Sequence, residues 1–436
     1  MWREKDGGMG GGDVNPYVLK ARRVDTGAVA RSAIDLFSGA GGVTLGLLNA
    51  GFDVLLCSDI SESCEATHRS NFPEIPFIRR DIHWLAGADI RREAGIGNGE
   101  LDLLIGGPPC QGFSIIGQRQ LWDPRNGLFR EFMRIAGELE PKTIVIENVT
   151  GLATLERGAV LAELGAAFRD AGYSIDCAEL LAAQYGVPQM RWRMFFVGWR
   201  NDLGQRGGFP QPTHGSPGIG DLVPNRTVPP ELTEGFVSIR QAIGDLPPVE
   251  AGGYATQYEQ GPEGSFQKAM RLFALPPLKN HYAPRLSPQN LERIRRLKPG
   301  DDWRTLPHEL LPGSMRRALR KDHTRRFRRM EWDGVARSII TRFRDPKSGE
   351  YIHPEQHRTI SIREAARIQS FPDWFVFEAS NSEQYDQVGN AVPPLLARAA
   401  AAKLRAMLDN PRSEQQAAVK CRYRIPEPML ALEAAE

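Results

Sequence analysis

One cysteine stands in a loop whose residue types suit chemistry better than packing. Cys110 lies within Gly-Gly-Pro-Pro-Cys-Gln-Gly-Phe-Ser, residues 106–114, directly after the apolar run 101–105. A lone cysteine is most often a buried packing residue, but a packed core position would not need two prolines and three glycines around it. Ligand sites of α/β proteins form at the carboxyl ends of strands. We therefore predict that Cys110 is a nucleophile.

A carboxylate occupies the corresponding place after the next apolar run. Glu147 opens the sequence Glu-Asn-Val directly after residues 142–146. A helix-capping role would explain an acid there without any chemistry. Parallel strands, however, bring their carboxyl ends to one edge of a sheet, so we expect Glu147 to lie near Cys110 and to act with it on one substrate.

Glycines and acids at three earlier strand ends indicate a nucleoside cofactor. Residues 35–42, Asp-Leu-Phe-Ser-Gly-Ala-Gly-Gly, lead from a strand into a helix at 43–48, and such glycines let a ligand approach the backbone. Asp59 ends the second expected strand, where an acid can bind ribose, and the third ends in Asp81 and Ile82, which could hold adenine. Without a cofactor, the glycines could simply form a tight structural turn, and the acids could simply cap helices. An NAD site is disfavoured because Thr44 stands where the dinucleotide fingerprint has its third glycine.

Apolar runs alternate with helical patterns over the first half of the chain. Residues 128–139 repeat apolar side chains at helical spacing. Strand, helix and strand in this rhythm predict an α/β fold with a parallel sheet. The expected strands are residues 33–37, 53–57, 77–82, 101–105, 143–146 and 194–197.

The texture changes after about residue 201. Pro and Gly become frequent, so regular structure is expected to be short and irregular there. A helix returns at Ser361, which forms a capping box with Glu364, and a last helix is expected from Pro393 or Pro394 through Met407. The glycine-rich residues 1–30 are expected to form a mobile arm and residues 409–436 a peripheral tail.

The overall composition is that of a soluble protein. The 436 residues are 41% hydrophobic and 25% charged, without an apolar stretch long enough for a membrane helix. With no secretion signal, we expect a cytoplasmic protein without a membrane partner. Five cysteines without CxxC spacing disfavour disulfides and zinc, and no metal site is predicted. The net charge of +2 is too small to indicate a nucleic-acid partner by itself.

Six segments together resemble the DNA (cytosine-5-)-methyltransferase family. The family blocks Phe-x-Gly-x-Gly, Pro-Cys-Gln and Glu-Asn-Val occur in that order, beginning at Phe37, Pro109 and Glu147. The likeness continues through Gln-Met-Arg-Trp-Arg, Arg-Glu-Ala-Ala-Arg-Ile-Gln-Ser-Phe-Pro-Asp and Gln-Val-Gly-Asn-Ala-Val-Pro, at 189–193, 363–373 and 387–393. It covers residues 34–402 except a variable stretch at 201–280.

The resemblance implies a domain organisation. A Rossmann-like S-adenosylmethionine-dependent methyltransferase domain would be discontinuous, formed by residues 31–200 plus 385–408. Residues 201–384 would form a smaller, irregular target-recognition domain.

The resemblance also implies the chemistry. The Cys110 thiolate adds to C6 of cytosine, which makes C5 nucleophilic enough to take a methyl group. Glu147, as a protonated carboxyl, meets N3 and the exocyclic amine, Arg193 donates to O2, and Arg191 supports the loop or the DNA phosphates. The implied cofactor is S-adenosylmethionine, and its expected contacts are Phe37, Gly39, Gly41, Gly42, Asp59, Ile60, Asp81, Ile82, Pro108, Asn390 and Val392.

Double-stranded DNA is the implied substrate, with the target cytosine flipped out of the helix. Residues 111–126 should close over it, with Ile116 inserted into the vacated stack and with Gln111 and Ser114 contacting DNA. A run of cations is interpreted as a phosphate-binding surface rather than a solvated helix face. The run comprises Arg316, Arg317, Arg320, Lys321, Arg325, Arg326, Arg328 and Arg329, of which the last four are the predicted DNA contacts.

Three other functions compete. A zinc deaminase would explain His353-Pro-Glu355, but its downstream Pro-Cys-x-x-Cys is absent, since Phe113 stands three residues after Cys110. Methylation of tRNA by the same chemistry is the nearest rival. A catalytically silent DNA-binding relative would be expected to lose Cys110 or Glu147. We expect a restriction-modification enzyme, monomeric on DNA, with a cognate endonuclease encoded separately.

Overall fold

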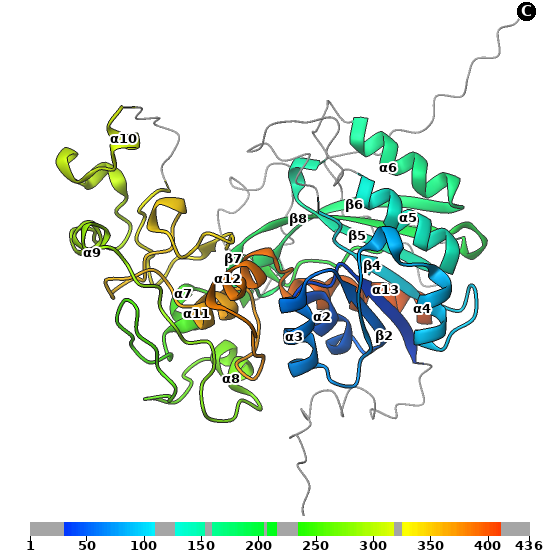
Figure 1. Cartoon of the computed structure of the whole chain (residues 1–436), viewed down its shortest axis with the longest axis horizontal. Coiled ribbons are helices and arrows are strands. Elements are labelled where there is room, and N and C mark those ends of the chain that lie inside the picture. Colours follow the sequence, from blue (N-terminus) through cyan, green and yellow to red (C-terminus); the bar gives the residue numbers. More distant parts are fainter. Residues whose placement is uncertain are drawn as a thin grey trace, which may run out of the picture.

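The chain folds into two lobes that meet along one side of a large sheet (Figure 1). The computed structural model describes residues 30–109, 127–152, 159–204, 207–215, 234–317 and 325–410. The predicted N-terminal arm, almost all of the predicted tail and the loop that carries Cys110 lie outside these residues.

A seven-stranded sheet forms the centre of the first lobe. Its strands are β1 (Arg31–Leu36), β2 (Phe52–Asp59), β3 (Phe77–Arg79), β4 (Leu103–Gly106), β5 (Thr143–Asn148), β6 (Tyr173–Leu181) and β8 (Trp192–Arg200). The order is β3-β2-β1-β4-β5-β8-β6. The first five are parallel, and β8 runs antiparallel to both neighbours. The predicted α/β fold with a mainly parallel sheet is confirmed.

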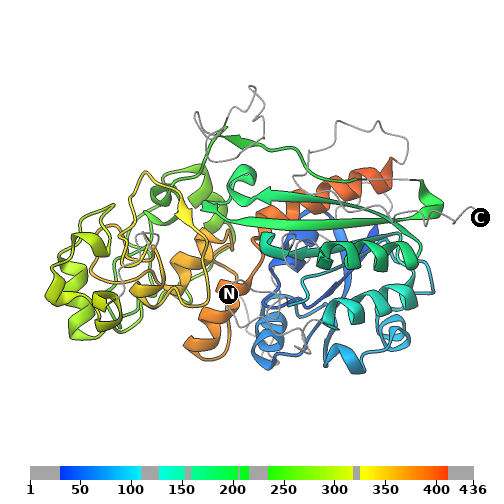
Figure 2. The same ribbon diagram turned by 90° about the horizontal axis from the view of Figure 1, so that it is seen from above.

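Helices cover both faces of this sheet (Figure 2). On one face lie α2 (Gly42–Asn49), α3 (Glu62–Asn71) and α13 (Pro394–Asp409), of which α2 and α13 contribute to a shared apolar core. On the other face lie α4 (Gly87–Ala94), α5 (Leu128–Leu139) and α6 (Ala159–Asp170). Every residue of β4 and β5 is buried, which fits the apolar runs at 103–105 and 144–146 in their sequences.

Two strands differ from the sequence prediction, and both lie at an edge of the sheet. β6 was not predicted, because Ser174, Asp176 and Glu179 interrupt its apolar pattern. The expected strand at 77–82 is wrong at its end: β3 stops at Arg79, and Asp81 instead caps a 3₁₀ turn over Ile82–Trp84. An edge strand has only one paired neighbour and more solvent, so its sequence is less constrained.

The C-terminal helix completes the first lobe. α13 packs directly on α2, where a Cβ on Gly46 would lie 2.4 Å from the Cβ of Ala397. Just ahead of it, α12 (Asn381–Asn390) begins at a Ser380 capping box that the sequence analysis missed. The lobe that begins at Arg31 is therefore closed by a helix that begins at Pro394, far away in the sequence.

The second lobe is built from short elements, as expected from its Pro- and Gly-rich sequence. A salt bridge buried within it joins Arg367 to Asp245 and Asp373. The predicted capping box at Ser361 is confirmed. Its helices are α7 (Ile239–Ile243), α8 (Ser265–Arg271), α9 (Pro288–Arg295), α10 (Gly313–Arg317) and α11 (Ile362–Ile368).

Two small strand pairs accompany these helices. β11 (Ala336–Arg337) pairs with β7 (Gln189–Met190) and thereby ties the second lobe to the first. The other pair joins β9 (His214–Gly215) to β10 (Glu234–Gly235). Among the described residues, no helix has the length and apolar character that crossing a membrane requires.

Candidate active site

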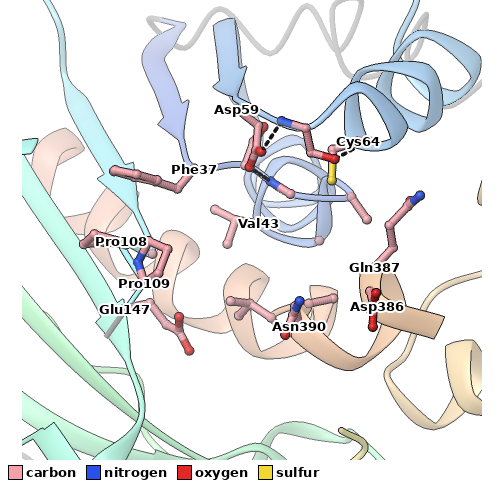
Figure 3. Close-up of a pocket in the computed structure, with 18 of the residues that line it drawn as sticks. Phe37, Val43, Asp59, Cys64, Pro108, Pro109, Glu147, Asp386, Gln387 and Asn390 are labelled. Carbon is pink, nitrogen blue, oxygen red and sulfur yellow. Dashed lines mark hydrogen bonds between the residues drawn. The ribbon is translucent and has the colours of Figure 1, made fainter. Parts of the chain in front are cut away.

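A cavity of about 970 Å³ opens at the carboxyl ends of the parallel strands. Phe37 follows β1, Asp59 ends β2, Pro108 follows β4 and Glu147 lies near the end of β5, while Asn390 enters from α12 (Figure 3). The sheet order places β1 beside both β2 and β4 and β4 beside β5, so these strand ends meet at one edge. The position is where parallel α/β sheets hold their ligands.

The three glycines of the turn after β1 differ in their surroundings. One of them has open space where a side chain would stand, and the other two are closely packed. Gly39 has φ +53°, and a Cβ added to it would meet no atom within 4 Å, so its backbone is open to a ligand. Gly41, at φ +94°, caps α2, and its Cβ would press on Phe72. At Gly42 a Cβ would lie 2.2 Å from the carbonyl oxygen of Val392. Gly41 does not itself line the cavity and acts through the backbone of the turn.

Below this turn lies a buried acid to which the sequence analysis gave no role. The Thr44 hydroxyl donates to Asp35 Oδ2 at 2.7 Å, which links the start of α2 to β1. It also lies 3.3 Å from Cys57 Sγ. Burial raises the pKa of Asp35 to about 7, against the hydrogen bond from Thr44. The bond holds the two ends of the turn together.

The acids at the ends of β2 and after β3 are already hydrogen bonded within the chain. Asp59 accepts from the backbone amides of Gly39 and Ser61, each at 2.9 Å. Asp81 accepts from the backbone and the ring of His83, and the bond to the backbone fits the capping alternative. Ile60, between them in the chain, is an apolar side chain left 64% exposed at the cavity. Such a surface suits a flat heterocycle.

Glu147 and Arg193 form a buried pair in the cavity wall. Arg193 Nε lies 2.7 Å from Glu147 Oε1, without the alignment of a hydrogen bond. Burial raises the pKa of Glu147 above its ordinary value, while Arg193 and Arg191 oppose that rise. A side chain on Gly107 would come within 3.1 Å of Glu147 Oε2, so this glycine is needed to seat the acid. The arrangement can hold a carboxyl that changes its proton within reach of a substrate.

Arg191 supports the surrounding backbone. It is only 2% exposed, and its Nη atoms donate to the carbonyl oxygens of Ile339, Gly389 and Ala391 at 2.6 to 3.2 Å. Of the two roles left open for it, support of the active-site loops fits this geometry, because DNA phosphates could not reach its guanidinium.

The predicted nucleophile follows, in the sequence, two prolines of the cavity wall. Pro108 and Pro109 line the cavity, and the carbonyl of Pro108 accepts from Asn148 Nδ2 at 3.1 Å. Cys110 follows them but lies outside the described residues, as do Gln111, Ser114 and Ile116.

Most of the predicted cofactor residues face this one cavity. They are Phe37, Gly39, Gly42, Asp59, Ile60, Asp81, Ile82, Pro108, Asn390 and Val392.

The cavity also contains residues that the sequence analysis did not identify. Ile339, Ile340 and Thr341 reach it from the second lobe, in a loop pressed against Gly389. Cys64 and Asp386 reach it from α3 and α12. Their segments carry no glycine turn or strand end that would have marked them.

The predicted DNA contact at Arg329 is wrong. Its side chain is buried, and its guanidinium donates to the carbonyl oxygens of Leu297, His353 and Ile294 at 2.7 to 2.9 Å. Arg328 is paired with Glu331 and Glu350.

The other arginines of the run whose side chains the structure describes differ in whether they have a partner. Arg316 binds backbone carbonyls from an exposed position. Arg325 is exposed and Arg326 partly buried, and the structure gives neither an ion pair with a described residue, so both stay predicted DNA contacts.

Comparison with known proteins points to one family. A family model described as C-5 cytosine-specific DNA methylase matches residues 32–406. The type II methyltransferase M1.HphI of Haemophilus parahaemolyticus is 37% identical over 380 residues, covering 86% of this chain and 87% of its own length. M.AgeI of Thalassovita gelatinovora is 33% identical over 431 residues, covering 85% and 98%.

Solved structures agree. A putative DNA modification methyltransferase encoded within an E. coli prophage superimposes with a TM-score of 0.64 at 27% identity, over 87% of this chain and 100% of that chain. The S. pombe Dnmt2 methyltransferase, at 17% identity, shares the fold with a TM-score of 0.51 over 87% and 99% of the two chains.

Proposed function

The chain belongs to the C-5 cytosine-specific DNA methylase family and is a DNA cytosine-5-methyltransferase, and from this premise we propose its mechanism. It transfers the methyl group of S-adenosylmethionine to C5 of a flipped-out cytosine in a specific duplex sequence. The reaction passes through a covalent bond between Cys110 and C6 of the base.

The observation that carries the proposal is the buried pair of Glu147 and Arg193 beside the loop to Cys110. When a thiolate adds to C6, negative charge grows on the ring and is greatest at N3 and O2. A protonated Glu147 can donate to N3, and burial favours that protonated form. The resulting enamine makes C5 the nucleophile, and loss of the C5 proton with departure of the thiolate restores the aromatic ring.

Arg193 can serve the oxygen of the base. Its Nη1 donates to the carbonyl of Trp192 and its Nε faces Glu147, so both are engaged within the chain. Its Nη2 has no partner among the described residues and is the atom we assign to O2.

The cavity residues fit S-adenosylmethionine, which supplies an electrophilic methyl group on its sulfonium when bound. The open backbone at Gly39 leaves space for the methionyl part, and each oxygen of Asp59 keeps a second lone pair for a ribose hydroxyl. Ile60 offers an apolar surface to adenine. Asn390 and Val392 close the side that faces α12 and α13.

Duplex DNA is the proposed substrate because the family model is described as a DNA methylase and the two relatives named above are type II methyltransferases. Residues 201–384 would recognise the target, and the loop 111–126 would close on the flipped base with Ile116 as a wedge. We place the enzyme in the cytoplasm, monomeric on DNA, in a restriction-modification pair with a separately encoded endonuclease.

Covalent capture tests this mechanism. Target DNA carrying 5-fluorocytosine should become irreversibly linked to Cys110, because fluorine cannot leave as the C5 proton does. Peptide mapping would identify the linked residue, and bisulfite sequencing of DNA from an expressing host would give the target sequence. Linkage at the buried Cys57, Cys64 or Cys177, or methyl transfer by Cys110→Ala, would overturn the mechanism. Transfer to tRNA but not to duplex DNA would overturn the substrate.

A further inference from the structure

Among the residues that the structure describes, five acidic side chains line the cavity, and four of them are engaged by other described residues. Asp59 and Asp81 accept hydrogen bonds as described above, and Glu147 pairs with Arg193. Glu383 accepts from Ser380 in the capping box of α12. The fifth acid is Asp386.

Asp386 stands apart because no described residue gives it a hydrogen bond or an ion pair. It is exposed at the cavity, four residues before Asn390, so the two share one face of α12 (Figure 3). It lies in the C-terminal half of the helix, where the helix dipole does not stabilise a negative charge. None of the interactions described above shows that Asp386 stabilises the fold. A charged side chain in a cavity without such a role is expected where it binds a ligand.

We infer that Asp386 allows the pocket to distinguish the positively charged cofactor from the product of its reaction. The inference rests on the proposed use of S-adenosylmethionine. That molecule carries a sulfonium charge in addition to its balanced amino and carboxylate groups. The product, S-adenosylhomocysteine, has a neutral thioether and no net charge. An unpaired carboxylate in the cavity wall attracts the positively charged cofactor and is indifferent to the uncharged product.

The expected effect is modest, because Asp386 is exposed to solvent. Interactions between exposed charges correspond to about a two- to fivefold change in affinity and weaken as salt is added. That is enough to shift the balance between cofactor entry and product retention. It also separates this role from shape recognition, which would affect both ligands alike.

Calorimetric titration of the DNA-free enzyme with each ligand tests the inference. Asp386→Asn should bind S-adenosylmethionine about two- to fivefold more weakly at about 0.05 M salt and bind the product as the wild type does. The difference should largely vanish at about 0.5 M salt. Asp386→Glu should restore the preference. Glu259→Gln removes the same charge from an exposed position outside the cavity and should change neither affinity.

The outcomes separate the inference from the proposed function. An equal loss of affinity for both ligands, or no loss for either, would overturn the role of Asp386 and leave the methyltransferase mechanism standing. A wild-type enzyme that binds neither ligand would overturn the proposed cofactor, and the inference with it.

Discussion

The Thr44 hydroxyl donates to Asp35 Oδ2 across 2.7 Å, in a place where both side chains are almost fully buried. The pair joins a strand to a helix at the two ends of the glycine turn. Because burial raises the pKa of Asp35 to about 7, the carboxyl is protonated in the folded protein at pH values where it is ionised in the unfolded chain.

This difference makes stability depend on pH. Between an unfolded pKa near 3.8 and a folded pKa near 7, the folded state binds the extra proton, so the free energy of unfolding falls as pH rises, by up to about 1.4 kcal/mol per unit. Asp35→Asn keeps an acceptor for Thr44 and removes the proton. Its stability relative to wild type should increase from pH 4 to pH 7 and then level off, measured by urea unfolding. Parallel curves for the two proteins would contradict this, and Glu93→Gln, an exposed change, is the control.

Glu147→Gln tests the acid in the mechanism. The variant should keep cofactor affinity but lower the single-turnover rate of methyl transfer by roughly 10²- to 10⁴-fold, as is typical when acid–base assistance is lost. In the wild type the rate should fall as pH rises through the raised pKa of Glu147, since the protonated form is the active one. The glutamine variant should lack that fall. An unchanged single-turnover rate would remove Glu147 from the mechanism.

Two arginines of one run should behave in opposite ways. Arg329→Ala leaves several buried carbonyl oxygens without a donor and should lower the free energy of unfolding by roughly 3 kcal/mol or more. Arg325→Ala should leave the free energy of unfolding within about 0.5 kcal/mol of that of the wild type. It should weaken binding to all DNA sequences and reduce the slope of log K against log salt concentration by about one phosphate contact. Urea unfolding and DNA titrations at several salt concentrations check both. A stable Arg329→Ala protein with reduced salt dependence would reverse the assignment.

An exchange of residues 201–329 tests where sequence specificity resides. Most of the flanking blocks contribute residues to the cavity and are the ones we propose to serve cofactor and cytosine. Contacts to base edges, in contrast, are worth about 1–3 kcal/mol each in discrimination. We expect that replacing this stretch with the matching stretch of a relative that recognises another DNA sequence gives a chimera that methylates the relative's sequence. The chimera should retain Arg329, because its acceptor His353 lies outside the exchanged part. An active chimera that still methylated the original sequence would contradict the assignment.

The sequence alone predicted the parts of the molecule where local pattern and tertiary role agree. The buried runs of β4 and β5 and the helix over Leu128–Leu139 were expected, because continuous burial or a single apolar face leaves a clear period. The turn from Gly39 to Gly42 was expected for a similar reason, since glycine at positive φ is a local requirement. Most of the cavity followed from these strand ends.

The features that the sequence did not predict depend on contacts between segments far apart in the chain. Arg329 looks like its exposed neighbours, and only its approach to carbonyls 24 to 35 residues away distinguishes it. Ile340 enters the cavity from the second lobe, held by contacts between Gly389 and its loop. Asp35 was within a recognised block, but its burial beneath the turn was not visible in the sequence.

The close packing of α13 on α2 sets the moment during synthesis at which the enzyme can first work. The glycine turn leaves the ribosome early, yet Val392 packs against Gly42 in that turn, and the residues at Ala397 pack against Gly46 of α2. A nascent chain that has folded β1 to β8 therefore carries a half-built pocket with an exposed apolar helix face. Methylation must await the translation of α13, so a chain released before that helix is made would be both inactive and prone to aggregate.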